Sequence, residues 1–154
     1  MAKKQTAGIL LYRIRNGELE VFLVHPGGPF WMKKDDGAWS IPKGETEKGE
    51  DLLHAAKREF HEETGFSLDG DFIALTPLRQ RGGKMVHAWA VEGDVDAESS
   101  KSNLFSMEWP PRSGKRAEFP EVDRAAWFTL ETAKQKILQS QAELLAELRR
   151  LVIR

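Results

Sequence analysis

Short apolar stretches separated by turn residues predict that strands make up much of this chain. Residues 6–12 form a continuous apolar run typical of a buried strand, and residues 18–25 alternate between apolar and polar positions. Asn16 and Gly17 between these stretches favour a turn, so the two strands are predicted to form a hairpin. Further strand patterns cover residues 39–42, 72–78, 84–92, 103–109 and 121–128.

Two other regions have helical spacing. An apolar stripe is formed by Leu53, Ala56, Phe60 and Thr64. Gly65 is placed to end this helix. Apolar residues spaced in the same way from 130 to 151 predict a C-terminal helix, bent or in two pieces, with Thr129 as its N-cap. Strands interleaved with helices in this order indicate the α/β class, with a mixed sheet between helices in an α/β/α sandwich.

Composition narrows the function classes. The 154 residues fit one domain spanning 1–154, and a net charge of −1 indicates neither a membrane-surface patch nor an extended nucleic-acid partner. No apolar run approaches the roughly 20 residues of a membrane span, so no membrane partner is expected. The absence of cysteine excludes disulfides, thiolate metal sites and a cysteine nucleophile, and it fits the cytoplasmic location that we expect.

Three acidic residues share one face of the first predicted helix. Glu59, Glu62 and Glu63 stand at positions i, i+3 and i+4, which lie close together at about 100° per residue. Such like-charge pairs weaken an isolated helix by a few tenths of a kcal/mol each. One interpretation is an acidic face exposed to solvent. The other is a set of oxygen ligands for a hard divalent cation such as Mg²⁺.

The residues around this acidic face favour the metal interpretation. Residues 44–66 read GETEKGEDLLHAAKREFHEETGF and match the pattern G-x5-E-x7-R-E-U-x-E-E-x-G-U, with U a bulky apolar residue, at every fixed position. In this motif the chain resembles the Nudix hydrolases. The resemblance implies a Mg²⁺ cofactor, with Mn²⁺ as a substitute, held by Glu59, Glu62 and Glu63. It also implies hydrolysis of a nucleoside diphosphate linked to another group.

The resemblance extends to residues beside the acidic face. It implies that the backbone at Lys43 and Gly44 contributes to the metal site through the Lys43 carbonyl, and the Lys43 side chain is placed to meet a substrate phosphate. Glu50 would point away from Glu59 on a longer helix, so it is interpreted as supporting the ligands, or as a ligand only through loop geometry. Arg58 is expected to orient a carboxylate.

Glu121 is the second candidate for the catalytic base. It precedes Trp127 by a spacing that resembles the segment after the substrate loop in Nudix enzymes, where a glutamate often adds a metal ligand or a base. The alternative is an ordinary solvent-facing acid. Glu59 is the base most consistent with the resemblance, and Glu121 is the other possibility to test.

Substrate-binding residues are predicted beyond the helix. His87 and Trp89 either line a base pocket or pack under a helix, and His25 is interpreted as a strand-end residue rather than a ligand. Residues 93–120 are long for a connection, which indicates a substrate lid or, alternatively, a mobile loop without function. Phe30 and Trp31 are two aromatic residues of a loop that is expected to be exposed. The remaining predicted substrate contacts are Arg79, Arg81, Lys84 and Trp109.

The expected substrate is a small nucleotide. Residues 39–45 (WSIPKGE) resemble the dinucleoside polyphosphate and diphosphoinositol polyphosphate hydrolases, and residues 7–13 (AGILLYR) resemble the diadenosine tetraphosphate hydrolases. A dinucleoside polyphosphate such as diadenosine tetraphosphate is therefore the first expectation. ADP-ribose, nucleotide sugars, oxidised nucleoside triphosphates and the 5′ end of RNA are the alternatives. A non-catalytic nucleotide-sensing module of this fold is expected to have lost motif carboxylates. An isopentenyl-diphosphate isomerase would need a cysteine. The resemblance fits a monomer or a homodimer.

Overall fold

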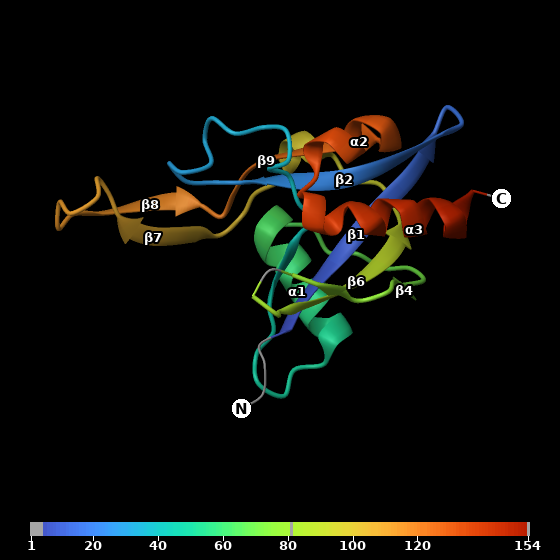
Figure 1. Cartoon of the computed structure of the whole chain (residues 1–154), viewed down its shortest axis with the longest axis horizontal. Helices are drawn as coiled ribbons and strands as arrows, with labels where there is room; N and C mark the ends of the chain where they lie inside the picture. The colour runs from blue at the N-terminus through green and yellow to red at the C-terminus, as the bar shows by residue number, and fades with distance from the viewer. Residues whose placement is uncertain (1–4, 81, 154) are drawn as a thin grey trace.

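A seven-stranded mixed sheet forms the centre of the protein (Figure 1). The structure is a computed structural model that describes residues 5–80 and 82–153. Five strands lie in the order β4-β6-β1-β2-β9, while β3 pairs with β1 and β5 pairs with β6. The strands are β1 (Gln5–Arg15), β2 (Glu18–Pro26), β3 (Lys43–Glu45), β4 (Ile73–Ala74), β5 (Leu78–Arg79), β6 (Met85–Glu92) and β9 (Val122–Thr129).

Strand β1 organises the sheet because it has partners on both sides. It runs parallel to β6 from Gln5 to Tyr12, and its last residues pair antiparallel with β2. Asn16 and Gly17 join β1 to β2 with φ angles of 53° and 78°. A two-residue hairpin turn with positive φ at both positions favours Asn followed by Gly. The predicted hairpin is therefore confirmed.

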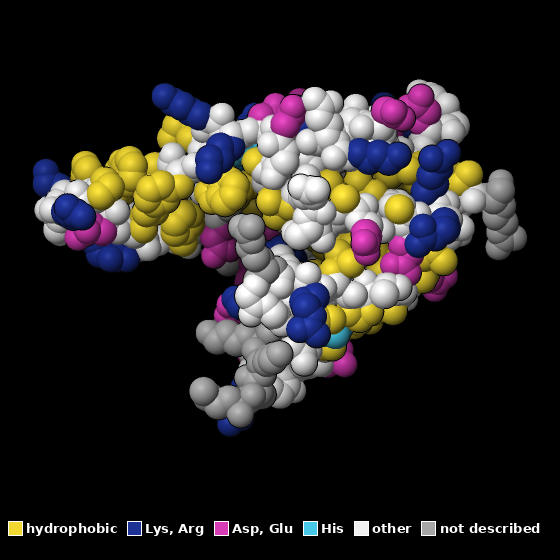
Figure 2. Space-filling view, in the orientation of Figure 1, with side chains coloured by type: hydrophobic (Ala, Val, Ile, Leu, Met, Phe, Trp, Pro, Cys, Tyr) yellow, Lys and Arg dark blue, Asp and Glu magenta, His cyan; other side chains and the backbone are white. Residues whose placement is uncertain are grey.

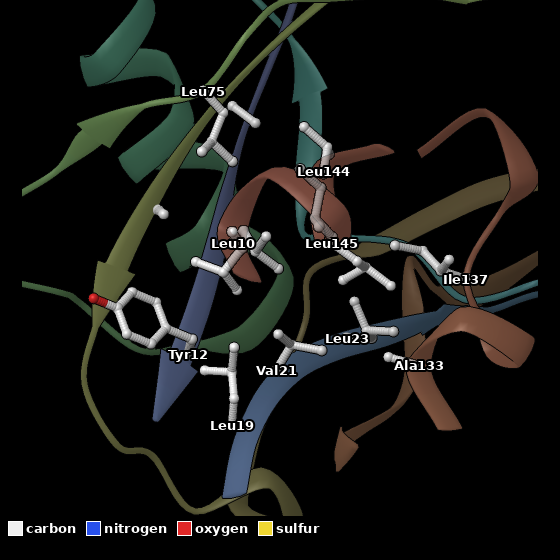
Figure 3. Close-up of a cluster of buried hydrophobic side chains, with 14 of the residues drawn as sticks. Leu10, Tyr12, Leu19, Val21, Leu23, Leu75, Ala133, Ile137, Leu144 and Leu145 are labelled. Carbon is white, nitrogen blue, oxygen red and sulfur yellow. The ribbon is translucent and has the colours of Figure 1, made fainter. Parts of the chain in front are cut away.

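Helices cover both faces of the sheet, which confirms the predicted α/β/α sandwich. Helix α1 (Leu52–Thr64) packs with Phe22 on one face, while α2 (Leu130–Lys136), the 3-10 turn η2 (Gln139–Gln141) and α3 (Ala142–Val152) cover the other. Figure 3 shows Leu10 and Leu23 of the sheet close to Leu145 of α3. Within residues 5–80 and 82–153, no helix is long and apolar enough to cross a membrane.

Residues 93–120 are folded rather than forming the open connection that their length indicated. They contain a 3-10 turn, η1 (Ala97–Ser99), and a second sheet in which β7 (Leu104–Glu108) pairs antiparallel with β8 (Arg116–Pro120). This hairpin, which we call the arm (residues 104–120), projects beyond the main sheet (Figure 1). Apolar side chains gather along it in the space-filling view (Figure 2). The strand predicted at 103–109 is confirmed as β7.

The strand predicted at residues 39–42 is wrong. Trp39 and Ser40 make isolated bridges, and the strand starts at Lys43, where β3 pairs with β1. The apolar pattern correctly indicated burial, because Trp39 and Ile41 are buried. However, the Ile41 N–H donates to the side chain of Gln141 (3.0 Å) rather than to a neighbouring strand. The strand predicted at 72–78 is likewise reduced to the short strands β4 and β5.

Candidate active site

Helix α1 supplies the acidic face, and its ends follow from its sequence. Asp51 is the N-cap and accepts a hydrogen bond from the His54 N–H (3.0 Å), while Gly65 ends the helix with a φ of 83°, as predicted. The buried residues of the helix are Ala55, Ala56, Glu59, Phe60 and Thr64. Glu59 therefore belongs to the buried side of the helix, which argues against a simple solvated acidic face.

The Glu59 carboxylate lies against the backbone of Gly44. A Cβ built at position 44 would lie 2.1 Å from both Cδ and Oε2 of Glu59, so a side chain at this position would displace the carboxylate. Strand β3 places Gly44 here by pairing it with Ala7 of β1. The first glycine of the motif thus allows the helix carboxylate to approach the sheet.

Arg58 bridges Glu50 and two of the predicted metal ligands. Its Nε and Nη2 donate to the two oxygens of Glu50 (2.8 and 2.9 Å), and its Nη1 donates to Glu59 (3.2 Å) and Glu62 (3.1 Å). The hydrogen bonds from Arg58 lower the pKa of Glu50 to about 2. Because α1 begins at Leu52, Glu50 reaches Arg58 from the preceding loop. Arg58 thus joins Glu50 to two of the predicted metal ligands, and the orienting role of Glu50 and Arg58 stays a prediction.

Glu63 lies where α1 meets β3. Its Oε1 accepts a hydrogen bond from the Lys43 N–H (3.3 Å). Burial and the neighbouring Glu59 raise the pKa of Glu63 to about 8, and burial together with Glu62 raises the pKa of Glu59. Both raised pKa values indicate that the protein's own cations only partly compensate the negative charge of Glu59 and Glu63.

A cavity of about 230 Å³ opens beside Glu63. It combines an aromatic side chain, an ammonium group and two carboxylates within a partly apolar wall. Its lining residues are Val24, Pro26, Trp31, Ala38, Ser40, Ile41, Lys43, Glu63, Glu121, Val122 and Leu138. Such a mixture suits a ligand that has both an apolar and an anionic part.

Glu121 reaches this cavity from the strand side, although it lies far from the motif in the sequence. The Glu121 N–H donates to the Asn103 carbonyl (2.9 Å), and the Glu121 carbonyl accepts from the Gly27 N–H (3.0 Å). The Asn103 N–H in turn donates to the Glu62 carbonyl on α1 (2.9 Å). Burial and the charge of Glu62 raise the pKa of Glu121. The structure therefore brings Glu121 together with the acidic helix face.

The donor set suits a divalent cation, although the carboxylates do not converge on one point here. In the described part of the chain (5–80 and 82–153), no group of three Asp, Glu, His or Cys side chains is arranged to hold a metal ion. Glu59 and Glu62 instead accept hydrogen bonds from Arg58. Carboxylate oxygens are nevertheless the ligands that Mg²⁺ prefers, and a bound cation would offset the repulsion that raises the pKa of Glu63.

The predicted cationic substrate contacts lie in different surroundings. Lys43 lines the cavity, and burial lowers the pKa of its ammonium group. Lys84 donates to Glu45 (2.5 Å), and Arg79 is exposed in β5. Arg81 lies outside the described residues. Among the described cations that were predicted to contact substrate, Lys43 therefore lines the cavity, whereas Arg79 and Lys84 do not.

The predicted aromatic and imidazole contacts are also separated. Trp89 packs in the cluster beneath α1, and His87 lies on the same side of β6. Trp109 lies on the arm with its ring edge-to-face against Phe30, at 5.6 Å between centroids. The described lining of the cavity includes neither His87 nor Trp109. For Trp89, the packing alternative is the one that the structure supports.

Trp31 was identified from the sequence as an aromatic loop residue but was not assigned to the site. The structure places it in the cavity wall with Lys43, Glu63 and Glu121. Local sequence around Trp31 has no metal or phosphate motif, so the exposed aromatic residue itself was the available signal. Its position depends on contacts with distant strands, which local patterns do not encode.

Comparison with known proteins identifies the family. The NUDIX domain matches residues 3–148, and the chain belongs to this family. Nudix hydrolases generally use divalent metal ions.

Three curated relatives have related sequences. Putative nudix hydrolase 1 of Caenorhabditis elegans is 31% identical over 107 residues, covering 67% of this chain and 27% of that protein. The 8-oxo-(d)GTP phosphatase of Mycolicibacterium smegmatis is 35% identical over 75 residues, covering 47% and 23%. The RNA pyrophosphohydrolase of Caulobacter vibrioides is 29% identical over 128 residues, covering 66% and 73%. The chain thus spans about a quarter of the length of the first two relatives.

Solved structures share the fold. The C. elegans Ap4A hydrolase in a binary complex has a TM-score of 0.68 at 22% identity, covering 96% of this chain and 98% of that one. The NUDIX domain of Shewanella oneidensis NrtR complexed with ADP ribose has a TM-score of 0.70 at 16% identity, covering 99% and 90%. At these identities the similarity establishes the sandwich fold and leaves the substrate to the chemistry of the site.

Proposed function

We propose that this chain is a Mg²⁺-dependent pyrophosphohydrolase that cleaves a phosphoanhydride bond in a nucleoside diphosphate linked to another group. The observation that carries the proposal is an acidic cluster of Glu59, Glu62, Glu63 and Glu121, in which Glu63 and Glu121 line the cavity and three of the four carboxyl groups have raised pKa values. A divalent cation bound by these carboxylates would relieve the repulsion among them, and a pyrophosphate needs the same cation to be attacked.

The carboxylates of Glu59, Glu62 and Glu63, with the backbone at Lys43 and Gly44, are the proposed ligands. When bound, the divalent ion neutralises phosphate oxygens and makes water more acidic. The Lys43 ammonium group lines the cavity, where it favours the binding of the anionic phosphate chain. Partial burial of that ammonium group weakens its hydration and strengthens such a contact.

A carboxylate of this chain must accept the proton of the attacking water. Glu59 is the proposed base and Glu121 is the alternative. General-base catalysis typically contributes about 10²–10⁴ in rate, so changing the responsible residue to glutamine should lower kcat by at least about 10². Arg58 has a positioning role, because its fork is fixed by Glu50 while the third nitrogen contacts Glu59 and Glu62.

The cavity supports an adenosine-containing polyphosphate as the substrate. The exposed ring of Trp31 can stack on a nucleobase while phosphates extend toward Lys43 and the carboxylates. A dinucleoside polyphosphate such as diadenosine tetraphosphate has the right parts, and the fold is shared with an Ap4A hydrolase. ADP-ribose is the second candidate, since it also joins adenosine to a diphosphate and a fold relative is complexed with it.

The test is a Mg²⁺-dependent turnover screen ranked by kcat/KM. The substrates are diadenosine tetraphosphate, ADP-ribose, a nucleotide sugar, an oxidised guanosine triphosphate and 5′-triphosphorylated RNA. We expect diadenosine tetraphosphate to rank first and EDTA to abolish activity until Mg²⁺ or Mn²⁺ is restored. An ADP-ribose preference of tenfold or more would reject the polyphosphate assignment. Turnover that survives Glu59→Gln and Glu63→Gln would place the chemistry elsewhere.

A further inference from the structure

His25 is a fully buried histidine with a hydrogen-bond partner at each ring nitrogen. Its side chain is 0% exposed. Nδ1 lies 2.7 Å from Oδ1 of Asp123 in β9, and Nε2 lies 2.6 Å from the carbonyl oxygen of Lys34 in the loop between β2 and β3. The residue that the sequence indicated as a simple strand end therefore links two segments that flank the cavity.

The two hydrogen-bond partners of His25 differ in what they can do, and only the Lys34 carbonyl is limited to accepting. The Lys34 carbonyl can only accept, so Nε2 carries a proton and donates to it. An ionised Asp123 also only accepts, so Nδ1 carries the second proton; a protonated Asp123 would donate to Nδ1 instead. The same number of protons is bound in both cases, and the bond to Lys34 is present in both.

Lys34 transmits this restraint to Trp31 in the cavity wall. The Lys34 N–H donates to the Trp31 carbonyl (2.9 Å), which closes a turn, and the Lys34 ammonium nitrogen lies 4.9 Å from the centroid of the Trp31 ring. Trp31 as a residue is 36% exposed, so its packing in the protein does not fully restrain it. Contacts through Lys34 therefore contribute to where the ring stands.

The loop that carries Trp31 is also attached at its two ends. The Gly27 N–H donates to the Glu121 carbonyl (3.0 Å), and the Gly37 N–H donates to the Gln135 carbonyl (3.1 Å). His25 adds a restraint between these two points, at Lys34. The other charged groups around this restraint also lie outside the carboxylate cluster: Arg124 stands over the Trp39 ring that packs on His25, and Lys136 pairs with Asp35.

We propose that His25 is a positioning residue that holds Trp31 in place as the nucleobase-stacking wall, acting through the Lys34 carbonyl. The proposal rests on the proposed nucleotide hydrolase function and adds a residue that determines substrate affinity without touching substrate. Loss of the His25 Nε2–H donor to the Lys34 carbonyl leaves the carboxylates in place but allows the Trp31 side chain to move. The effect is therefore on KM rather than kcat.

Two conservative variants separate the two hydrogen bonds. His25→Gln places an amide N–H near the Nε2 position and keeps a donor for Lys34, whereas His25→Asn places its amide near Nδ1 and reaches only Asp123. Base stacking on an aromatic ring has a large effect, so we expect Trp31→Ala to raise KM about fivefold or more. His25→Asn is expected to raise KM at least threefold with kcat within twofold of wild type, and His25→Gln to restore KM to within twofold.

A double-mutant cycle tests whether His25 acts through Trp31. His25→Asn in the Trp31→Ala background is expected to change KM by less than 1.5-fold. An unchanged threefold effect there would overturn the proposal, as would equal KM values for the asparagine and glutamine variants. If His25→Asn fails to fold, the exposed change Lys34→Gln removes the ammonium group beside Trp31, and a KM within 1.2-fold of wild type would count against the same route.

A substrate-free measurement separates failure of this proposal from failure of the proposed function. The fluorescence of Trp31 is obtained as the difference between each protein and its Trp31→Phe counterpart. His25→Asn is expected to increase acrylamide quenching of that signal relative to His25→Gln. If wild type hydrolyses none of the nucleotides but the quenching difference is found, the positioning role stands and the hydrolase function falls. Turnover with equal quenching gives the opposite conclusion.

Discussion

Replacing Glu63 by glutamine should stabilise the metal-free protein while removing its activity. The pKa of Glu63 is raised from its ordinary value of 4.5 to about 8 by burial and by Glu59. A raised carboxyl pKa favours folding at low pH, and this advantage is lost as the pH rises from 4.5 toward 8. Glutamine has no charge to bury and can still accept the hydrogen bond from the Lys43 N–H. The variant therefore does not lose folding stability as the pH rises, whereas wild type does because its Glu63 carboxyl is buried.

The size of the effect follows from the two pKa values. At pH 7 the unfolded chain has lost the Glu63 proton while the folded chain retains it, and the linkage amounts to at most about 3 kcal/mol. At pH 5 it falls below about 1 kcal/mol. For a domain of this size, 3 kcal/mol corresponds to a Tm change of roughly 6–12 °C.

The assay is thermal unfolding in EDTA at pH 5, 7 and 8.5, followed by the same scans with Mg²⁺. Wild type should lose stability relative to Glu63→Gln as the pH rises, and Mg²⁺ should stabilise wild type more than the variant, because only wild type has all of the proposed ligands. Glu62→Gln is the matched control: it removes the negative charge that pairs with the Arg58 guanidinium and should not raise the metal-free Tm. A Glu63→Gln protein whose Tm at pH 8.5 equals that of wild type would refute the reasoning.

Three further changes test neighbouring parts of the structure. Gly44→Ala should lower kcat by at least about 10² with little loss of secondary structure by circular dichroism, since the new Cβ would displace the Glu59 carboxylate; unchanged kcat would contradict the close packing. Glu50→Gln should destabilise the protein by about 1–3 kcal/mol near neutral pH in urea unfolding. Because the pKa of Glu50 is lowered to about 2, its stabilising effect in wild type is present above pH 4.5 and lost as the pH falls toward 2, so the gap to the variant should close in acid. Gln141→Leu leaves the Ile41 N–H unpaired and should cost about 1–3 kcal/mol while kcat/KM stays within twofold; a large fall in kcat/KM would mean that this pair also shapes the site.

The parts of the molecule that the sequence predicted well are those set by local chemistry. Glu59, Glu62 and Glu63 follow one another on a helix whose end is set by Gly65, and their proximity follows from helical geometry. The Asn16-Gly17 turn likewise contains its own signal in its φ preferences. In both cases the residues that determine the structure are close together in the chain.

The parts that were missed depend on pairs far apart in the chain. Gln141 satisfies the Ile41 N–H from 100 residues away, which replaces the ladder expected of a strand at 39–42. His25 and Asp123 meet across 98 residues. A hydrophobic pattern records that a residue is buried but not which distant polar group serves its backbone. For the same reason, the sequence did not decide whether Trp89 lines a base pocket or packs under a helix.

The root of the arm is fixed by main-chain hydrogen bonds from Asn103 and Glu121, which tolerate a change of side chain as long as the residue is not proline. Gly27 is an exception, since a Cβ there would collide with the Pro120 carbonyl. The hairpin tip beyond this root is a separate small sheet. A randomised library covering residues 109–115 should therefore change the tip without changing the carboxylates that are proposed to carry hydrolysis. The arm can therefore vary in sequence independently of the proposed catalytic residues.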